Sequence, residues 1–356
     1  MQAKGKIGLV GVGAAGAALA VEMWLRGRTD IILFDADPAV REAFVRAGGI
    51  AYDGLFGQGV AGGMLFADSL AEIVSRVECL IVTVTAGRHV DLGREMAPLI
   101  GSDQLVVLHT GYVGGCRVFY SALRSGGCTA PPHLAEAINT LHLAAARKPC
   151  DVFIRGRKRW LEVTGLTPEA TRRALDLLTG TFPEIAAGRV TLETGLNNPN
   201  PIGHVPALVG NLGLLDRNLG AMSQGTLQFD ELRSGSVQLL GDAFEQERIA
   251  VMKAIGLRPI PLANFIQRAY GPDDRLTPPL PRFGTKLLPR FFEEDVAAAC
   301  VPIESLGAWC GTPTPVISAL VEICAAVADT NFRTVGRTVA TLGADWVESE
   351  CSAVRT

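Results

Sequence analysis

The sequence lacks a dominant charge of either sign. Charged residues make up 19% of its 356 residues, and the formal net charge at pH 7 is −3. Proteins that bind nucleic acid or an anionic membrane surface usually carry a basic patch. The composition therefore favours small-molecule partners over nucleic acid or a membrane.

Paired cysteines are also lacking. The eight cysteines include no C-x-x-C pair and no spacing typical of a zinc site. Several stand in apolar runs, for example Cys79 and Cys324, where a free thiol behaves as a small hydrophobic side chain. We expect reduced cysteines, no bound metal and a cytoplasmic protein.

No apolar stretch is long enough to cross a membrane. Residues 7–21 carry no charge, but Glu22 interrupts them, and a helical span needs about 20 such residues. No cleavage site follows, so a signal peptide is not expected either. The glycines within this stretch indicate a different role.

Three glycines follow the apolar run at residues 6–10 and precede an alanine-rich helical segment. In such a strand–turn–helix unit, G-x-G-x-x-G is typical of dinucleotide binding. Its glycines allow a tight turn, a close approach to a pyrophosphate and close helix–strand packing. The helix N-terminus adds unpaired N–H groups. We predict that the cofactor binds at Gly11, Gly13, Ala14, Ala15 and Gly16.

Asp35 ends the second apolar run, at residues 30–34. It stands at the spacing, roughly 20 residues beyond the glycines, where a carboxylate binds the adenosine ribose of NAD. Such a carboxylate would also repel the 2′-phosphate of NADP, although the nearby Arg41 leaves NADP open. The alternative is a solvated turn aspartate before Pro38.

Two further apolar runs, at residues 79–85 and 104–108, continue the alternation of strand and helix. This order predicts a doubly wound parallel sheet. Because ligands bind at the carboxyl ends of such strands, we expect Thr85, Ala86 and the loop 109–115 beside the cofactor. A methyltransferase that uses S-adenosylmethionine also has a glycine-rich first loop, but the three-glycine spacing and the helical second half disfavour it.

The apolar spacing changes to a helical period after about residue 195, as in residues 236–255. Arg248 lies on the apolar stripe of that segment, where a buried guanidinium needs a carboxylate or a substrate anion. Residues 190–192 are expected to form the last strand. We therefore predict an α/β protein with a Rossmann-type domain at residues 1–188 and an all-helical domain at residues 189–356.

Hydride reduction of a carbonyl or imine requires a proton donor, commonly a histidine held by a carboxylate. His204, in a turn-rich segment at the domain junction, and His109, in the glycine loop, are the candidates among five histidines. From spacing alone His204 is better explained by a proline-broken helix start with Asn200 as its N-cap. We expect His89 to line the adenosine side or cap a helix, His133 and His142 to be structural, and the basic residues 155–159 to form a solvated turn.

The sequence resembles the opine dehydrogenase family, which includes octopine and nopaline dehydrogenases and the bacterial carboxyethyl-norvaline dehydrogenase. The resemblance covers nearly the whole chain and is weaker at residues 116–190 and 207–235. It rests on the glycine pattern, Asn198-x-Asn200 before His204, residues 244–256 and the long run 290–343. It implies that the chain uses NADH or NADPH to reduce the imine formed between an amine and an α-keto acid.

The resemblance also implies individual roles. His204 matches the family's catalytic histidine, Asp295 its carboxylate partner, and Arg290 an arginine that holds the keto-acid carboxylate, for which a guanidinium fork is well suited. To these we add Thr140, His109 and Asn200 as candidate substrate-binding residues.

Two departures from the family lie beside this site. Val205 separates His204 from Pro206, where the family usually has proline directly after the histidine, and Ala-Ala-Ala-Cys replaces Pro-x-Gly-Leu after Val296. They leave the identities of the amine and the keto acid open. The alternative functions are a 2-hydroxy-acid or ketone reductase of the same architecture and a non-catalytic dinucleotide sensor. A homodimer through the helical domain is a further expectation.

Overall fold

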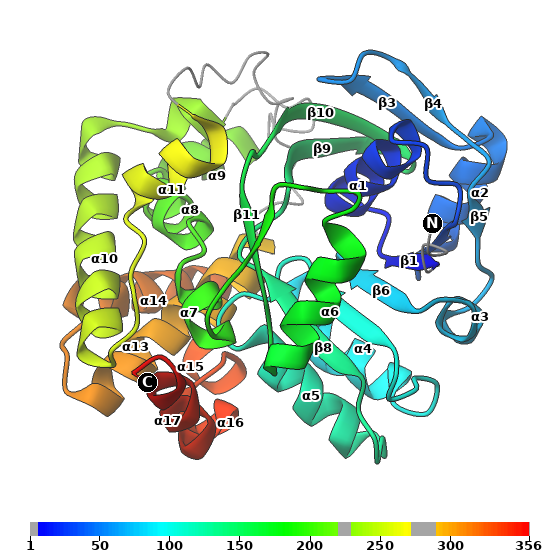
Figure 1. Cartoon of the computed structure of the whole chain (residues 1–356). Coiled ribbons are helices and arrows are strands. Elements are labelled where there is room, and N and C mark those ends of the chain that lie inside the picture. The colour runs from blue at the N-terminus through cyan, green and yellow to red at the C-terminus, as the bar shows by residue number, and fades with distance from the viewer. Residues whose placement is uncertain (1–5, 220–228, 272–289, 356) are drawn as a thin grey trace.

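The computed structural model describes residues 6–219, 229–271 and 290–355. Figure 1 shows the strands and their flanking helices on the right, with the helices of the second half beside them on the left. The large sheet has eight strands in the order β12-β11-β8-β7-β6-β1-β2-β5. Its strands are β1 (Ile7–Val10), β2 (Ile31–Phe34), β5 (Leu65–Phe66), β6 (Cys79–Val82), β7 (Leu105–Leu108), β8 (His133–Ala137), β11 (Leu161–Gly165) and β12 (Ile185–Ala187).

The central strands of this sheet are parallel and buried. Every residue of β1, β6 and β7 is buried, which explains their uninterrupted apolar runs. The predicted parallel Rossmann-type sheet is confirmed, with one antiparallel pair, β8 with β11. The helices of this half are α1 (Ala14–Leu25), α2 (Pro38–Ala47), α3 (Leu70–Arg76), η1 (Ala86–Arg88), α4 (His89–Met96), α5 (Gly115–Ser125) and α6 (Pro168–Leu178).

A second, four-stranded sheet was not predicted. It has the order β4 (Gly59–Ala61), β3 (Ile50–Gly54), β10 (Asp151–Arg157), β9 (His142–Lys148) and packs against α1. Glu22 of α1 is consequently buried, with an oxygen 2.5 Å from His142 Nε2. Burial opposes the ionisation of Glu22, but hydrogen bonds from His142 and Arg157 outweigh it and lower the pKa of Glu22 to about 2.

The prediction that residues 155–159 form a solvated turn is wrong. They complete β10 and lead out of it, and several of them are buried. Arg157 donates to Glu22 at 2.7 Å and to Glu184 at 2.6 Å. Lys158 is 2% exposed and donates to the carbonyl oxygen of Thr140 at 2.7 Å. Sequence spacing could not reveal these distant partners.

The expected strand at residues 190–192 is also wrong, because a helix, α7 (Thr191–Leu196), begins there. Glu350, far along the chain, accepts hydrogen bonds from the Leu192 N–H and the Thr191 hydroxyl, both at 2.8 Å. A carboxylate at a helix N-terminus satisfies unpaired N–H groups and interacts favourably with the helix dipole. A three-residue apolar run cannot distinguish a strand from such a helix start.

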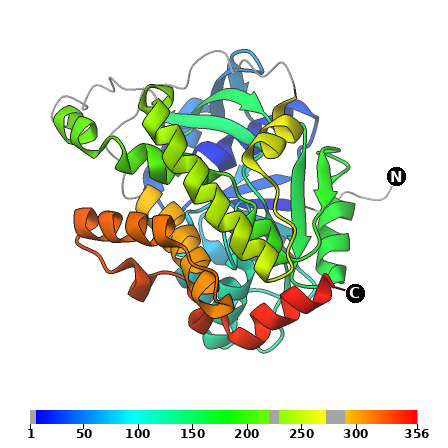
Figure 2. The ribbon, with the colours of Figure 1, turned by 90° about the vertical axis from the view of Figure 1, so that its left-hand side faces the viewer.

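Helices form the second half, as predicted. Figure 2 shows the long α10, in yellow-green, crossing this half with the orange helices below it. Its residues Val237, Phe244 and Val251 are buried along the predicted stripe. The elements are α8 (Asn200–Val209), α9 (Leu212–Leu219), η3 (Phe229–Leu232), α10 (Gly235–Ala254), α11 (Leu262–Tyr270), the π-helix η4 (Phe292–Cys300), α13 (Val301–Cys310), α14 (Pro315–Ala328), α15 (Phe332–Val335), α16 (Val339–Leu342) and α17 (Ala344–Ala353).

The guanidinium of Arg248, on α10, is bound by groups of the protein itself. Its guanidinium is fully buried and donates to the carbonyl oxygens of Leu196, at 3.1 Å, and Ile260, at 2.9 Å. Glu245, one turn earlier, lies 3.4 Å away. Two carbonyl groups and this carboxylate therefore bind the guanidinium. Of the two partners that the sequence analysis considered, the structure shows a carboxylate of the protein.

We propose residue 188 as the boundary between the two parts, because β12 ends at Ala187 and helices follow. One helix of the second part crosses this division: α11 packs on the first part, with the Phe265 ring 5.7 Å from that of Trp160. Within the three described ranges, no single helix has the length and apolar character needed to cross a membrane. One pair bent by 102°, Pro315–Ala328 with Phe332–Leu342, meets the criteria of length and composition jointly.

Candidate active site

The three glycines of the loop serve three different structural purposes. Gly11 has φ +94°, a conformation that other residues rarely adopt. A Cβ on Gly16 would lie 2.0 Å from the carbonyl oxygen of Gly11, so only glycine lets α1 approach β1 this closely. A Cβ on Gly13 would meet no protein atom within 4 Å. The loop therefore has open space at its second glycine, where a pyrophosphate would approach the backbone.

Asp35 lies at the carboxyl end of β2 and supports the same loop. Its carboxylate accepts from the N–H of Val12 at 2.7 Å and from the N–H of Asp37 at 2.9 Å. Helix α1 begins at Ala14 without a side-chain cap, which leaves its first N–H groups for an anion. These residues fit a dinucleotide: an open glycine, an uncapped helix start and a carboxylate at the next strand end.

The loops after β6 and β7 join the cofactor side to the helical half. The N–H of Ala86 donates to Glu294 at 3.3 Å, and the N–H of Val113 donates to the carbonyl oxygen of Ala298 at 3.1 Å. Arg337, which is buried, donates to the carbonyl oxygens of Gly111 at 2.8 Å and Val113 at 2.9 Å. The strand ends that carry the expected cofactor residues Thr85 and Ala86 are thus fixed against η4.

His204 and Asp295 come together from positions 91 residues apart. His204 Nδ1 lies 2.9 Å from Asp295 Oδ2. Asp295 is 1% exposed, whereas the His204 side chain is 26% exposed. Asp295 belongs to the π-helix η4, and π-helices are rare and frequent at functional sites. A buried carboxylate on one ring nitrogen fixes the ring's orientation and tautomer.

The start of α8 places His204, and it differs from the prediction by one residue. Asn200 is the first helical residue, and Pro199 precedes it as the N-cap. The side chain of Asn198 accepts from the Asn200 N–H at 3.1 Å. Val205, one of the two departures from the family pattern, is completely buried. The departure therefore changes the core behind the histidine and leaves the His204–Asp295 contact intact.

A chain of amide and hydroxyl groups leads to this pair. Of its members, Asn198 and Asn200 were named from the sequence, whereas Asn139 was missed. Asn139 Nδ2 donates to the side-chain oxygens of Asn198 at 2.8 Å and Asn200 at 2.9 Å. Asn200 Nδ2 donates to the Tyr112 oxygen at 3.5 Å, and the Tyr112 hydroxyl donates to Asp295 Oδ1 at 3.4 Å. Tyr112 was predicted only as part of the loop 109–115. Polar residues next to glycines at a strand end were the available signal.

Arg290 lies one turn before Asp295 and is held by Glu294. Its Nε donates to Glu294 Oε2 at 2.6 Å, and the arginine side chain is 45% exposed. Burial raises the pKa of Glu294, although the positive charge of Arg290 acts in the opposite direction. Glu294 thus contacts Arg290 with one oxygen and the Ala86 loop with the other.

His109, in the loop after β7, lies against the turn between β8 and β9 that carries Thr140. His109 is buried, and its Nε2 accepts from the N–H of Leu141 at 3.1 Å. Burial, with the nearby His142 and Lys158, lowers the pKa of His109 to about 3. Burial therefore disfavours His109 as the proton donor. The Thr140 hydroxyl donates to the carbonyl oxygen of His142 at 3.0 Å.

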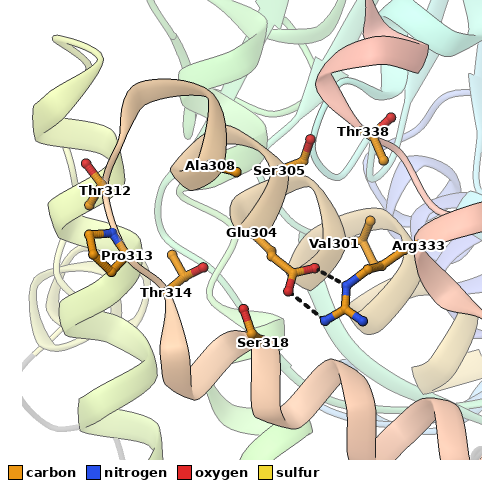
Figure 3. Close-up of a pocket in the computed structure, with 10 residues that line it drawn as sticks. All are labelled: Val301, Glu304, Ser305, Ala308, Thr312, Pro313, Thr314, Ser318, Arg333 and Thr338. Atoms are coloured by element: carbon orange, nitrogen blue, oxygen red, sulfur yellow. Dashed lines mark hydrogen bonds and ion pairs between the residues drawn. The ribbon is translucent and has the colours of Figure 1, made fainter.

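A separate pocket of about 450 Å³ lies in the helical half, and Figure 3 shows the residues that line it. An ion pair between Glu304 and Arg333, at 2.7 Å, stands on one side of it. The rest of the lining combines the apolar residues Val301, Ala308 and Pro313 with hydroxyl side chains, namely those of Ser305, Thr312, Thr314, Ser318 and Thr338. None of the predicted site residues is among those that line it.

Comparison with known proteins agrees with both halves of the chain. Residues 6–112 match the NAD binding domain of 6-phosphogluconate dehydrogenase, and residues 188–328 match the α-helical domain of NAD/NADP octopine/nopaline dehydrogenase. An opine dehydrogenase of Arthrobacter sp. (strain 1C) is 26% identical in an alignment of 353 positions that covers 94% of this chain and 94% of the relative.

Two solved structures share the fold over nearly the whole chain. Octopine dehydrogenase in complex with NADH and agmatine has a TM-score of 0.71 at 15% identity and covers 97% of both chains. Yersinopine dehydrogenase with NADP+ bound has a TM-score of 0.69 at 13% identity and covers 98% of this chain and 99% of its own.

The nucleotide-binding sheet followed by this helical domain defines an NAD(P)-dependent oxidoreductase. Within this class, the similarity to an opine dehydrogenase extends along almost the entire chain. Residues 188–328 match the α-helical domain of the octopine/nopaline dehydrogenases, and the chain as a whole is similar to an opine dehydrogenase.

Proposed function

We propose that the protein condenses an amine donor, such as an amino acid, with an α-keto acid and reduces the resulting imine to a secondary amine. The observation that carries this proposal is the His204–Asp295 pair, 2.9 Å apart on α8 and η4. A proton donor held by a buried carboxylate is what hydride reduction of an imine requires.

In the proposed reaction His204 provides the proton and Asp295 holds its ring. A bound reduced nicotinamide supplies the hydride to the imine carbon. Asp295 binds Nδ1, so Nε2 is the atom that gives its proton to the nitrogen of the forming amine.

Arg290 is the proposed anchor for the keto-acid carboxylate. Glu294 binds its Nε at 2.6 Å and thereby fixes the plane of the guanidinium. The two terminal nitrogens are then the donors proposed for the substrate carboxylate, in the forked geometry that arginine favours. Thr140 is proposed to anchor the carboxylate together with Arg290, and Asn200 and His109 are proposed as further substrate-binding residues. The Asn139–Asn200 contact at 2.9 Å joins the turn that carries Thr140 to α8.

NAD is the proposed cofactor in preference to NADP. The support is Asp35, a carboxylate at the end of β2 where the adenosine ribose would lie. Gly11, Gly13, Ala14, Ala15 and Gly16 are the proposed pyrophosphate contacts, and Thr85 with Ala86 the proposed contacts after β6. Related structures contain NADH in octopine dehydrogenase and NADP+ in yersinopine dehydrogenase.

We also propose a cytoplasmic homodimer. All eight cysteines are free, and seven of them are buried, which suits a reducing compartment. The outer face of α14 exposes Ile323 at 41% and Val327 at 51%, and exposed apolar side chains on one helix face suit an interface between subunits. Light scattering on Val327→Asp and the unaltered protein tests the dimer, which the variant should weaken.

The test of the proposed reaction is NADH oxidation by the purified protein with a panel of α-keto acids crossed against a panel of amines. We expect oxidation only when both partners are present, and a product whose mass equals that of the secondary amine. Oxidation with a keto acid alone would instead establish a 2-hydroxy-acid reductase. NADH binding without turnover for any pair would favour the dinucleotide sensor.

A further inference from the structure

Tyr112 enters the helical half from the loop after β7. Its side chain is 3% exposed and packs with residues of the helical core such as Leu196 and Val296. Its backbone has φ +58°, which is rare for a residue with a bulky side chain. Such a conformation persists only where the surroundings impose it, and it concentrates at functional sites.

The surroundings of Tyr112 hold this conformation from several sides. Arg337 binds the carbonyl oxygens of both neighbours, Gly111 and Val113. The N–H of Val113 donates to Ala298 on η4. A Cβ on Gly195 would lie 2.3 Å from the Tyr112 carbonyl oxygen, so α7 can lie against this backbone only with glycine there. The loop therefore has little freedom to move the tyrosine away.

The result of this arrangement is a hydroxyl directed at the second oxygen of Asp295. The Tyr112 hydroxyl lies 3.4 Å from Oδ1, while His204 Nδ1 lies 2.9 Å from Oδ2. Asn200 donates to the Tyr112 oxygen at 3.5 Å, so the tyrosine proton points to the carboxylate. Each oxygen of Asp295 thus has one partner of its own.

We infer that Tyr112 is a positioning residue for the His204–Asp295 pair, holding one oxygen of Asp295 so that the other faces His204. The expected effect of Tyr112 on kcat rests on the proposed function, whereas its expected effect on the His204 ring does not. It assigns a role in the helical site to a residue of the nucleotide-binding domain. The hydroxyl has two effects: it fixes the plane of the carboxylate, and it takes up part of its negative charge.

Removing the hydroxyl therefore has a predictable sign. In Tyr112→Phe the carboxylate of Asp295 loses a hydrogen-bond donor, so more of its negative charge acts on His204, which favours the protonated ring. The pH midpoint of the His204 titration should therefore be higher in Tyr112→Phe than in the unaltered protein. The carboxylate also loses its fixed plane, and kcat should fall about tenfold while both KM values stay within about twofold.

Other charged groups around the pair do not change in this variant. Arg290 stays paired with Glu294 on η4. On α10, which packs against α8, Glu245 stays next to Arg248. Glu247 accepts from the first N–H groups of α14, the third element against α8. A shift of the His204 midpoint can therefore be assigned to the tyrosine hydroxyl.

The experiment follows the His204 ring by NMR on protein with labelled histidine, over a pH series, with the His204 signal assigned from His204→Gln. Tyr112→Phe is compared with the unaltered protein and with Tyr120→Phe, the same chemical change on the following helix α5. A rise of the midpoint in Tyr112→Phe alone, with thermal unfolding within a few degrees of the unaltered protein, supports the inference. Equal midpoints in all three proteins overturn it.

Kinetics then separate this inference from the proposed function. With the partner pair found in the panel, Tyr112→Phe should lower kcat, and it should add nothing further in an Asp295→Asn background. Full additivity of the two substitutions would overturn the positioning role even if the reaction is as proposed. If no partner pair reacts, the proposed function fails, whereas the NMR comparison still decides the role of Tyr112.

Discussion

The glycine loop offers a pair of substitutions with opposite expected effects. Gly16→Ala places a methyl group 2.0 Å from the Gly11 carbonyl oxygen and 2.6 Å from the Thr83 hydroxyl. The first of these is a backbone atom and cannot rotate aside, so α1 must move away from β1. Gly13→Ala places the same methyl group where no protein atom lies within 4 Å, at a φ of −72° that alanine adopts readily.

The two variants should therefore separate stability from cofactor binding. Overpacking usually costs 1–3 kcal/mol, and with a backbone atom as the obstacle we expect about 3 kcal/mol or more for Gly16→Ala. For Gly13→Ala we expect a change in unfolding free energy within about 0.5 kcal/mol. Its methyl group would occupy the approach of the pyrophosphate, so the Kd for NADH should rise at least about tenfold, equivalent to about 1.4 kcal/mol.

Urea unfolding and titration of NADH fluorescence measure the two quantities on the same preparations. Unaltered NADH affinity in Gly13→Ala would refute the placement of the phosphates at the second glycine. Unaltered stability in Gly16→Ala would refute the close packing of α1 on β1. Gly180→Ala, at a glycine after α6 whose Cβ would also meet nothing within 4 Å, serves as a control for NADH binding.

Three further predictions concern single side chains. Burial lowers the pKa of Lys158 from 10.5 to about 7, so the unfolded chain binds more protons and stability rises with pH through this window. Lys158→Met should flatten that rise by up to about 1.4 kcal/mol per pH unit in urea unfolding, and parallel curves would contradict the burial of a charged amine. Asp35→Ser should weaken NADH binding by about tenfold and NADPH binding less, and an unchanged ratio of the two Kd values would argue against a ribose contact. Arg290→Lys should raise the KM for the keto acid at least about tenfold because the fork is lost, and steady-state kinetics with an unchanged keto-acid KM would remove Arg290 from the site.

The sequence was informative wherever a local pattern has one physical cause. Continuous apolar runs predicted the parallel strands, because only strands buried on both faces lack polar positions. The three glycines predicted the loop, because each meets a separate steric or conformational demand. The periodic stripe of α10 predicted its buried face.

Features that depend on distant partners could not be predicted. The start of α7 depends on Glu350, and the burial of Arg157 depends on Glu22 and Glu184. Spacing favoured a structural role for His204, and only the resemblance named Asp295 as its partner. Tyr112 could not be predicted as a site residue from the sequence. Its proposed role depends on the packing of η4 against the loop that carries Tyr112.

The central claim is that His204, held by Asp295, donates the proton in amine-dependent reduction. The most direct test is the rate of NADH oxidation with both partners present in His204→Ala and in His133→Ala, a histidine at the start of β8. The account predicts a fall of at least about 100-fold in the first variant, with NADH affinity unchanged, and a rate within about twofold of the unaltered protein in the second. An equal rate in both variants would contradict it.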